Sequence, residues 1–117
     1  MSDQIAITGI RGFGFHGLFE EEKKNGQEFI VDIRITADLS DAGRSDQIES
    51  TIDYGKVAIR VKELIESDSF NLIERLAEVI AESVKKEFQA ESVEVTVHKP
   101  NAPVDLDFED ISVTIKR

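Results

Sequence analysis

The sequence of 117 residues contains no cysteine, and it has only two histidines and two prolines. The lack of cysteine excludes disulfides, thiolate metal sites and cysteine nucleophiles together. The two histidines, His16 and His98, leave little material for a histidine-rich metal centre or for a Ser-His-Asp triad. If this protein is an enzyme, carboxylates, lysine and tyrosine must carry its chemistry.

Long hydrophobic runs are also missing, because no stretch of about 18 apolar residues occurs in the chain. Residues 1–4 lack the basic start and the apolar stretch of a secretory signal, so we expect a cytoplasmic protein without a membrane partner. Basic residues are scarce as well. The 14 lysines and arginines stand against 24 acidic residues, and the net charge of −10 opposes binding to nucleic-acid phosphates. Nucleic acid is therefore not an expected partner.

What the chain does contain is the composition of a soluble globular domain, with 40% hydrophobic and 32% charged residues. Its length fits one hydrophobic core and is too short for two. No internal repeat, low-complexity tract or interdomain linker is visible. We therefore expect residues 1–117 to form a single domain.

The spacing of apolar residues predicts an α+β fold with the element order ββααββ. The predicted strands are 4–13, 27–40, 92–99 and 108–117, and the predicted helices are 54–67 and 72–88. A charged loop is expected between the first two strands. The two helices would cover one face of a four-stranded antiparallel sheet. A ferredoxin-like order, βαββαβ, is the nearest alternative, but residues 66–70 between the helices offer no strand.

Such a sheet leaves hydrogen-bonding edges open. The first two predicted strands carry few proline or lysine residues that would guard those edges. Closure against copies of the same chain into a barrel would satisfy them, and it would place sites between subunits. We therefore expect a homo-oligomer.

Both prolines fall in the hexapeptide 98–103, His-Lys-Pro-Asn-Ala-Pro, where Lys99 directly follows a predicted strand. Pro100 restricts the backbone of the residue before it, so Lys99 should have less freedom than an ordinary surface lysine. The simpler alternative is a strand end followed by a loop that a lysine merely solvates. The hexapeptide alone favours this alternative, because surface lysines greatly outnumber functional ones.

Tyr54, the only tyrosine, and Glu74 stand near the starts of the two predicted helices. The phenol of Tyr54 could exchange a proton during catalysis, or it could simply cover the edge of the core. Glu74 follows Asn71 by three residues, which is the spacing of a capping box. The same carboxylate, beside free N–H groups, could instead face a ligand such as a pterin or guanine edge. Both explanations of Glu74 stay open.

Three further residues have simple structural explanations. Glu22 belongs to a run of acidic and basic residues, and such runs usually form a solvated loop face. His16 is more often a hydrogen-bonded structural residue than a catalyst. Gly26 is expected to supply a turn conformation before the second strand.

A series of short motifs runs in order along nearly the whole chain. They are Gly12–Gly17 (GFGFHG), Glu22 followed by Gly26-Gln27, Phe29–Asp32 (FIVD), Asp41–Asp46 (DAGRSD), Thr51–Tyr54 (TIDY), Asn71–Ala77 (NLIERLA) and His98–Pro103 (HKPNAP). Each motif alone is weak evidence, but the ordered set at compatible spacing is specific. Together they resemble the dihydroneopterin aldolases of folate biosynthesis.

The resemblance implies the tunnelling fold, in which ββααββ subunits form tetrameric barrels that commonly stack as octamers. It also implies cleavage of 7,8-dihydroneopterin, a small-molecule pterin, to 6-hydroxymethyl-7,8-dihydropterin and glycolaldehyde. In this retro-aldol reaction the C=N bond of the pterin accepts the released electrons. No Schiff base, metal or organic cofactor is therefore required, which agrees with a chain that lacks cysteine.

By analogy with the family, two groups of residues bind the substrate. Glu74 would anchor the amino-pyrimidine edge of the pterin, with help from backbone groups of Leu72 and Ile73. Ile52 would line the pocket of the ring.

Three further residues would carry the chemistry by the same analogy. Lys99 would act in proton transfer on the side chain of the substrate, and Glu22 would help to hold the reacting water or hydroxyl. Tyr54 from a neighbouring subunit would protonate the enol intermediate. Lysine is protonated at neutral pH unless desolvation or a nearby cation favours its neutral form, so the charge state of Lys99 stays open.

Two other functions compete with the aldolase. A dihydroneopterin triphosphate 2′-epimerase would share the retro-aldol step, but its anionic substrate suits a chain of net charge −10 poorly. Local arginines such as Arg11 or Arg75 could offset that argument, and some epimerase side activity would be compatible with an aldolase. A non-catalytic module that binds pterins or purines is the third candidate. The presence of both Tyr54 and Lys99 argues against it.

Residues 104–107, which follow the second proline, could be a solvated loop or a lid over the pocket.

Overall fold

The structure is a computed structural model that describes residues 3–117. Its centre is a four-stranded antiparallel sheet with the strand order β1-β2-β3-β4. The strands are β1 (Asp3–Gly14), β2 (Gln27–Ala37), β3 (Ser92–His98) and β4 (Ser112–Lys116). The helices are α1 (Glu20–Asn25), α2 (Ser40–Ser45), α3 (Tyr54–Glu66) and α4 (Ile73–Glu87), and Ile48–Ser50 form a 3₁₀ turn, η1. The fold is therefore α+β.

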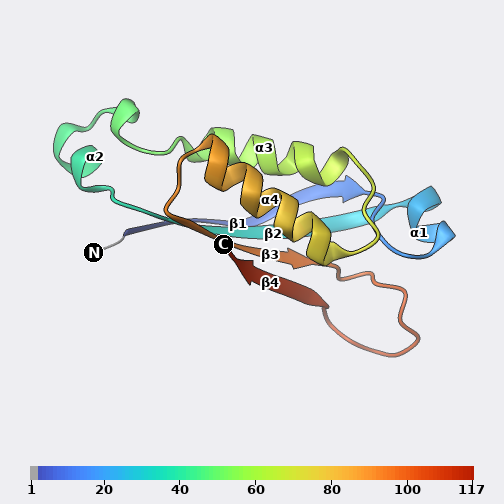
Figure 1. Ribbon diagram of the computed structural model, residues 1–117. Helices are drawn as coiled ribbons and strands as arrows, with labels where there is room; N and C mark the ends of the chain where they lie inside the picture. Colours follow the sequence, from blue (N-terminus) through green and yellow to red (C-terminus); the bar gives the residue numbers. More distant parts are fainter. Residues whose placement is uncertain (1–2) are drawn as a thin grey trace.

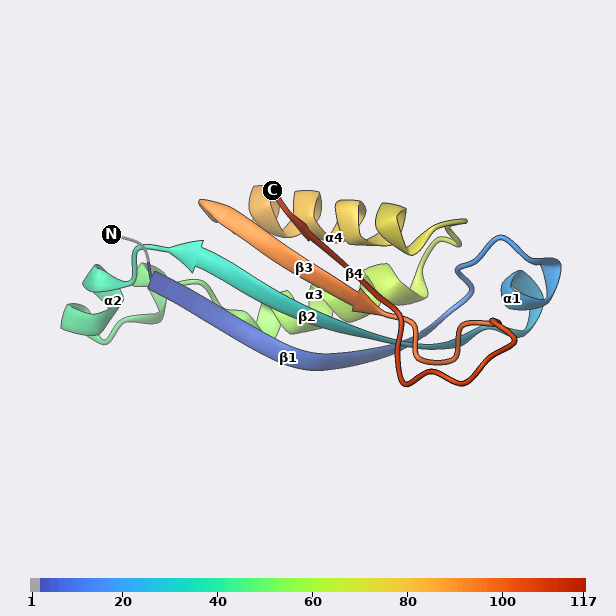
Figure 2. The same ribbon diagram turned by 90° about the horizontal axis from the view of Figure 1, so that it is seen from below.

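Alternation of side chains along the two central strands builds the core. Every second residue of β2 and β3 points toward α3 and α4 and is almost fully buried: Phe29, Val31, Ile33, Ile35, Val93, Val95 and Val97. The two helices lie side by side on this face of the sheet and cover it with their own apolar stripes (Figure 1). Burial of this apolar surface is the main force that holds the layers together. Viewed from below, the opposite face of the sheet lies in front of the helices (Figure 2).

The predicted sheet and its two long helices are confirmed, but two strands are at least three residues shorter than predicted. The strand predicted over 27–40 ends at Ala37, where the side chain of Asp38 accepts a hydrogen bond from the N–H of Ser40 and starts a turn. The strand predicted over 108–117 begins only at Ser112, opposite His98, because β3 ends there and offers no further partner. Within residues 3–117 no strand lies between α3 and α4, so the ferredoxin-like order is wrong.

The connection between β1 and β2, predicted as a charged loop, contains the short helix α1. The acidic residues of its first turn and the lysines of its last turn complement the helix dipole. The side chain of Glu22 also accepts a hydrogen bond from the N–H of Phe19, which precedes the helix. Gly26 ends the helix with a positive φ of 69°, as expected for a glycine that makes a turn.

The start of α4 also differs from the prediction. The N-cap is Leu72, so Glu74 is the second helical residue and the predicted capping box with Asn71 is wrong. The side-chain oxygen of Asn71 instead accepts a hydrogen bond of 2.6 Å from Nζ of Lys23. Because Asn71 is used in this tie to α1, its side chain does not cap the helix.

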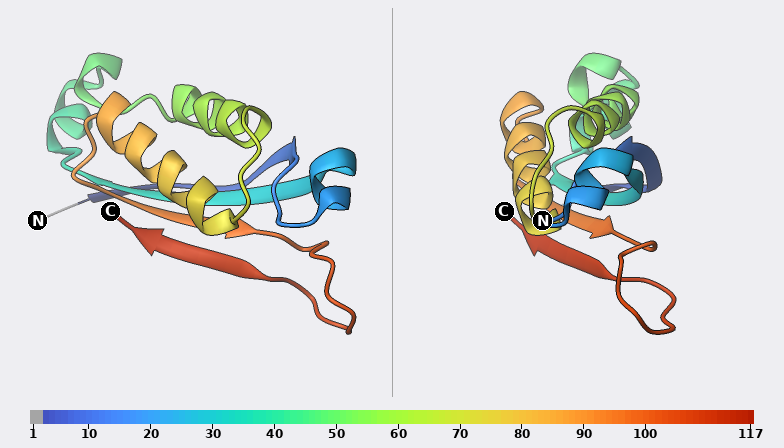
Figure 3. Two further views of the ribbon diagram at one scale, coloured as in Figure 1. Left: turned by 45° about the vertical axis from the view of Figure 1, so that its right-hand side comes forward. Right: turned by 90° about the vertical axis from the view of Figure 1, so that its right-hand side faces the viewer.

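The molecule is elongated, with extents of 52 × 25 × 19 Å. The helix α1 and the segment between β3 and β4 lie at one end, and α2 with η1 lies at the other (Figure 3). None of the helices within residues 3–117 is long and apolar enough to cross a membrane.

Candidate active site

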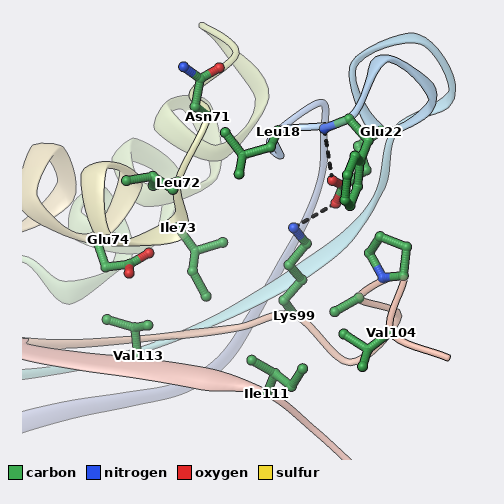
Figure 4. A pocket seen from close by; sticks show the side chains of 13 residues that line it. Leu18, Glu22, Asn71, Leu72, Ile73, Glu74, Lys99, Val104, Ile111 and Val113 are labelled. Carbon is green, nitrogen blue, oxygen red and sulfur yellow. Dashed lines mark hydrogen bonds and ion pairs between the residues drawn. The ribbon is translucent and has the colours of Figure 1, made fainter. Parts of the chain in front are cut away.

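A cavity of about 290 Å³ opens at the end of the molecule where β3 ends. Four parts of the chain line it: the residues around α1, the start of α4, the segment between β3 and β4, and the beginning of β4. The lining residues are Leu18, Phe19, Glu22, Asn71, Leu72, Ile73, Glu74, Lys99, Ala102, Pro103, Val104, Ile111 and Val113 (Figure 4). Apolar walls with a few charged groups are typical of pockets for small molecules.

The ion pair between Lys99 and Glu22 forms one side of this cavity. Nζ of Lys99 lies 2.6 Å from Oε2 of Glu22, and their side chains are only 14% and 6% exposed. Lys99 is the first residue after β3, and its N–H donates a hydrogen bond of 2.7 Å to the carbonyl of Ile111. Lys99 is therefore not the solvated surface lysine that the hexapeptide alone favoured, and the expected solvated position of Glu22 is also wrong.

Three donors stabilise the buried carboxylate of Glu22. Besides Lys99, the N–H of Phe19 and the side-chain amide of Gln27 each donate a hydrogen bond of 3.3 Å to it. Burial alone would raise the pKa of Glu22, but the hydrogen bonds from Lys99 and Phe19 outweigh it and hold this pKa below its usual value. Glu22 is therefore ionised at neutral pH, and an ionised carboxylate in contact with Lys99 stabilises the lysine as an ammonium.

The backbone at Gly17 lies against the Glu22 carboxylate. A Cβ atom at this position would collide with all three atoms of that carboxyl group, and Gly17 also has a φ of +151°. Any side chain here would displace Glu22, so the glycine is a requirement of the site. The carbonyl of Gly17 accepts a hydrogen bond of 2.6 Å from Nζ of Lys23, which fixes α1 beside the cavity.

The buried side chain of His16 joins this wall to the rest of the fold, as expected for a structural histidine. Its Nε2 donates to the carbonyl of Ile65 at 2.7 Å, and its Nδ1 accepts from the N–H of Phe70 at 3.0 Å. Phe70 also stacks on the imidazole. These contacts use the neutral ring, with the proton on Nε2.

His16 gives a prediction for pH dependence. Burial lowers the pKa of His16 against the opposing hydrogen bond to Ile65, and the cations of Lys99 and Lys23 lower it further. The folded state therefore takes up this proton less readily than the unfolded chain, and the His16 contribution to stability should be lost as the pH falls below about 6.5. His98 has a raised pKa, so its contribution to stability should instead be lost as the pH rises.

An NMR titration of the two imidazole rings checks this prediction, with the signals assigned through His98→Gln. His16 should remain neutral at a pH where His98 is already protonated. The opposite order of the two titrations would contradict the packing described for His16.

Glu74 lies on the other side of the cavity from the Lys99–Glu22 pair (Figure 4). Its exposed carboxylate forms no hydrogen bond or ion pair within residues 3–117. It stands in the first turn of α4, where the N–H groups of Ile73 and Glu74 have no intrahelical acceptor. A carboxylate acceptor next to such donors can bind a ligand edge that presents both donors and acceptors.

The structure brings five of the seven predicted site residues together and leaves two elsewhere. Glu22, Leu72, Ile73, Glu74 and Lys99 line the same cavity. The other two lie at the opposite end of the sheet: Ile52 lines a hollow with Ala37 and Phe88, and Tyr54 is 66% exposed as the first residue of α3. Within one chain they do not contribute to the cavity.

Several functional contacts were missed in the sequence. Gln27 belongs to a quoted motif but received no role, although it supports Glu22. Leu18 and Phe19 form an apolar wall, and two adjacent apolar residues before a charged run were the signal for it. Of the residues 104–107, only Val104 lines the cavity. No group of three or more possible metal ligands occurs within residues 3–117.

The sequence of the chain is similar to known enzymes over nearly its whole length. The sequence model of the family "Dihydroneopterin aldolase" matches residues 5–116. The dihydroneopterin aldolase of Streptomyces coelicolor is 43% identical over 115 residues, covering 98% of this chain and 97% of the relative. The dihydroneopterin aldolase of Bacillus subtilis is 37% identical over 116 residues, covering 98% of this chain and 97% of the relative.

A solved structure agrees with these relatives. The E. coli dihydroneopterin aldolase in complex with neopterin superimposes with a TM-score of 0.90 at 27% identity, covering 98% of both chains. Fold and sequence thus point to the same group of enzymes. The chain belongs to the dihydroneopterin aldolase family.

Proposed function

We propose that the cavity between Glu74 and the Lys99–Glu22 pair is where this chain performs the retro-aldol reaction of its family. The substrate would be 7,8-dihydroneopterin, and the products 6-hydroxymethyl-7,8-dihydropterin and glycolaldehyde. The observation that carries this assignment is the buried ion pair of 2.6 Å, which faces across an apolar cavity a carboxylate, that of Glu74, without a partner among residues 3–117. One end of the cavity can hold the ring and the other can act on its side chain.

The ring would bind at the start of α4. The amino group and ring N–H of the pyrimidine edge would donate to the Glu74 carboxylate, while backbone groups at Leu72 and Ile73 would bind the neighbouring acceptors. The side chains of Leu72 and Ile73 line the cavity and would contact the ring faces. This arrangement directs the substrate side chain toward Lys99.

The bond that breaks joins the two hydroxyl-bearing carbons nearest the ring. The outer hydroxyl loses its proton and becomes the aldehyde of glycolaldehyde, while the electron pair of the broken bond moves into the C=N bond of the pterin. The enol left on the ring then receives a proton at its side-chain carbon, so protons and electrons balance. The ring itself accepts the electrons, so we propose that no cofactor takes part.

Lys99 and Glu22 would serve this reaction as a pair. Because Glu22 is ionised and in contact with Lys99, the ammonium form of the lysine is available to stabilise the alkoxide that develops on the outer hydroxyl. Glu22 would hold the hydroxyl or the water that removes the proton. The reaction then needs no neutral lysine.

Tyr54 and Ile52 would come from a neighbouring subunit. They lie at the far end of the sheet, while β1 and β4 are edge strands of the chain. Pairing of these edges between copies would close a barrel, which we propose to be a homotetramer or a stacked octamer. The far end of one chain would then complete the cavity of the next, and Tyr54 would protonate the enol.

Charge at the cavity favours the unphosphorylated substrate over the triphosphate of an epimerase. The carboxylates of Glu22 and Glu74 outnumber the ammonium of Lys99 among the lining residues. Arg11 is paired with Glu28 at 2.8 Å, and Arg75 does not line the cavity. We therefore propose an aldolase, with 2′-epimerase activity at most as a side reaction. We also propose that it acts in the cytoplasm.

The experiment that tests this proposal measures glycolaldehyde and 6-hydroxymethyl-7,8-dihydropterin after incubation of the purified protein with 7,8-dihydroneopterin. Both products should appear in equal amounts, and turnover of the triphosphate should be slower. Tight pterin binding without glycolaldehyde release would indicate a binding module. Faster reaction of the triphosphate, with epimer as the main product, would indicate the epimerase.

A further inference from the structure

A second charged cluster lies next to the cavity but outside it. His98, the last residue of β3, contacts two carboxylates: its Nε2 lies 2.7 Å from Oδ2 of Asp32, and its Nδ1 lies 2.7 Å from Oδ2 of Asp110. All three side chains are partly sheltered, with exposed fractions between 24% and 38%. Neither carboxylate lines the cavity, and the proposed mechanism does not use this cluster.

The cluster connects three segments at the point where the sheet ends. Asp32 belongs to β2, His98 ends β3, and Asp110 precedes β4. Asp32 is itself held by the N–H of Gly9, which donates to its other oxygen at 2.8 Å from the irregularity in β1. His98 therefore joins the rigid sheet to the end of the segment that follows it.

That segment, residues 99–111, carries a large part of the active-site wall. It contains Lys99, and it supplies Ala102, Pro103, Val104 and Ile111 to the lining of the cavity. Two contacts close it at its base: the N–H of Lys99 donates to the carbonyl of Ile111, and His98 contacts Asp110. Much of the remainder is exposed, so these contacts have few others to support them.

The charge of His98 strengthens both of its contacts. Partial burial would lower the pKa of His98, but the hydrogen bonds to Asp110 and Asp32 outweigh it and hold this pKa above its usual value. With both ring nitrogens protonated, the imidazolium donates to both carboxylates, and a neutral ring can donate to only one. Among its neighbours, Ser112 of β4 is uncharged, Arg11 of β1 pairs with Glu28, and the ammonium of Lys99 pairs with Glu22.

We propose that His98 is a positioning residue of the active site, which clamps the segment 99–111 to the sheet through Asp32 and Asp110 and thereby sets the place of Lys99. This role rests on the proposed function of Lys99. The clamp acts on the end of the cavity where the side chain of the substrate reacts. The ring site at Glu74 belongs to α4 and is built independently of it.

The test compares His98→Gln and Asp110→Ala with Thr96→Val. Thr96 lies two residues earlier in β3, and its hydroxyl bonds to that of Thr114 in β4 at 2.8 Å. The control thus removes a side-chain contact between β3 and β4 while leaving the segment 99–111 untouched. Asp110→Ala alters an exposed residue outside the strands. It therefore still tests the clamp if His98→Gln folds poorly.

The readouts are kcat for glycolaldehyde release, Kd for 6-hydroxymethyl-7,8-dihydropterin and the pH profile of kcat. Misplacement of a catalytic group by about 1 Å costs up to roughly 10²-fold in rate, so kcat should fall by about 10-fold or more in both clamp variants. Kd should stay within roughly threefold of wild type, because a shift of about 0.6 kcal/mol or less is expected where the ring site is intact. Thr96→Val should match wild type in both kcat and Kd.

The pH profile separates a positioning role from a general structural one. Wild-type kcat should fall on the alkaline side as the His98 imidazolium loses a proton and releases one carboxylate. Asp110→Ala should move this fall to lower pH, and His98→Gln should lack it. If both clamp variants match Thr96→Val while wild type cleaves dihydroneopterin, the inference is wrong and the proposed function stands. If wild type releases no glycolaldehyde, the proposed function itself fails.

Discussion

Lys99→Met should lower kcat for glycolaldehyde release by about 10²–10³-fold, the usual loss when a group that stabilises a developing oxyanion is removed. The ammonium of Lys99 lies in the cavity, 2.6 Å from Glu22, with 14% of its side chain exposed. Methionine keeps much of the chain length and removes the charge. Steady-state kinetics on 7,8-dihydroneopterin measures the effect.

The same substitution leaves Glu22 buried without its cation, and an unpaired buried charge can cost about 3–5 kcal/mol of stability. The double variant Glu22→Gln, Lys99→Met removes both charges and should recover much of that stability, as measured by urea unfolding, without recovering turnover. Lys24→Met, in the same charged run as Glu22 but exposed, is the matched control and should behave as wild type. Near-normal turnover of Lys99→Met would refute the assigned role.

Glu74→Gln should weaken pterin binding by about 10²-fold, because it replaces an ionised acceptor of two hydrogen bonds worth roughly 1.5–3 kcal/mol each. The exposed carboxylate has no partner within residues 3–117 that the change would strand, so stability should not fall. Calorimetric titration with 6-hydroxymethyl-7,8-dihydropterin measures the affinity, and kcat at saturating substrate should change only a few-fold.

The control for Glu74 is Glu82→Gln, an exposed glutamate two turns later in the same helix. It removes an equal charge from α4 and should leave the affinity unchanged. Equal losses of pterin affinity in both variants would mean that the net charge of the helix matters and that Glu74 makes no direct contact with the pterin. A loss of kcat with unchanged affinity would place Glu74 at the reacting end of the cavity.

The sheet and the long helices were predictable from the sequence because their apolar periods are regular and long. Alternation in β2 and β3 and the apolar stripe of α4 each place the buried face correctly. The helix α1 was not predictable in this way, because it has only six residues and no apolar period. Contacts with distant residues hold it in place, among them the ion pair of Glu22 with Lys99 and the hydrogen bond of Lys23 to Asn71, and sequence spacing does not show them.

Site geometry was harder to predict for a related reason. Glu22 and Lys99 are distant in the sequence, and only the fold shows that they form an ion pair. Asn71 has the residue type and spacing of an N-cap, but Lys23 from α1 occupies its side-chain oxygen. The resemblance to the family named five residues that line the cavity, while the structure supplied neighbours that position Glu22: Gln27, which donates to its carboxylate, and Gly17, which lies against it.

The central claim is that the active site joins Lys99 of one chain to Tyr54 of another. Coexpression of Lys99→Met and Tyr54→Phe chains in equal amounts tests it most directly, with glycolaldehyde release as the readout. Each variant alone should be nearly inactive. The mixed oligomer should regain roughly a quarter of wild-type activity, since that share of sites takes both groups from intact chains. A mixture no more active than the two variants measured separately would contradict a shared site.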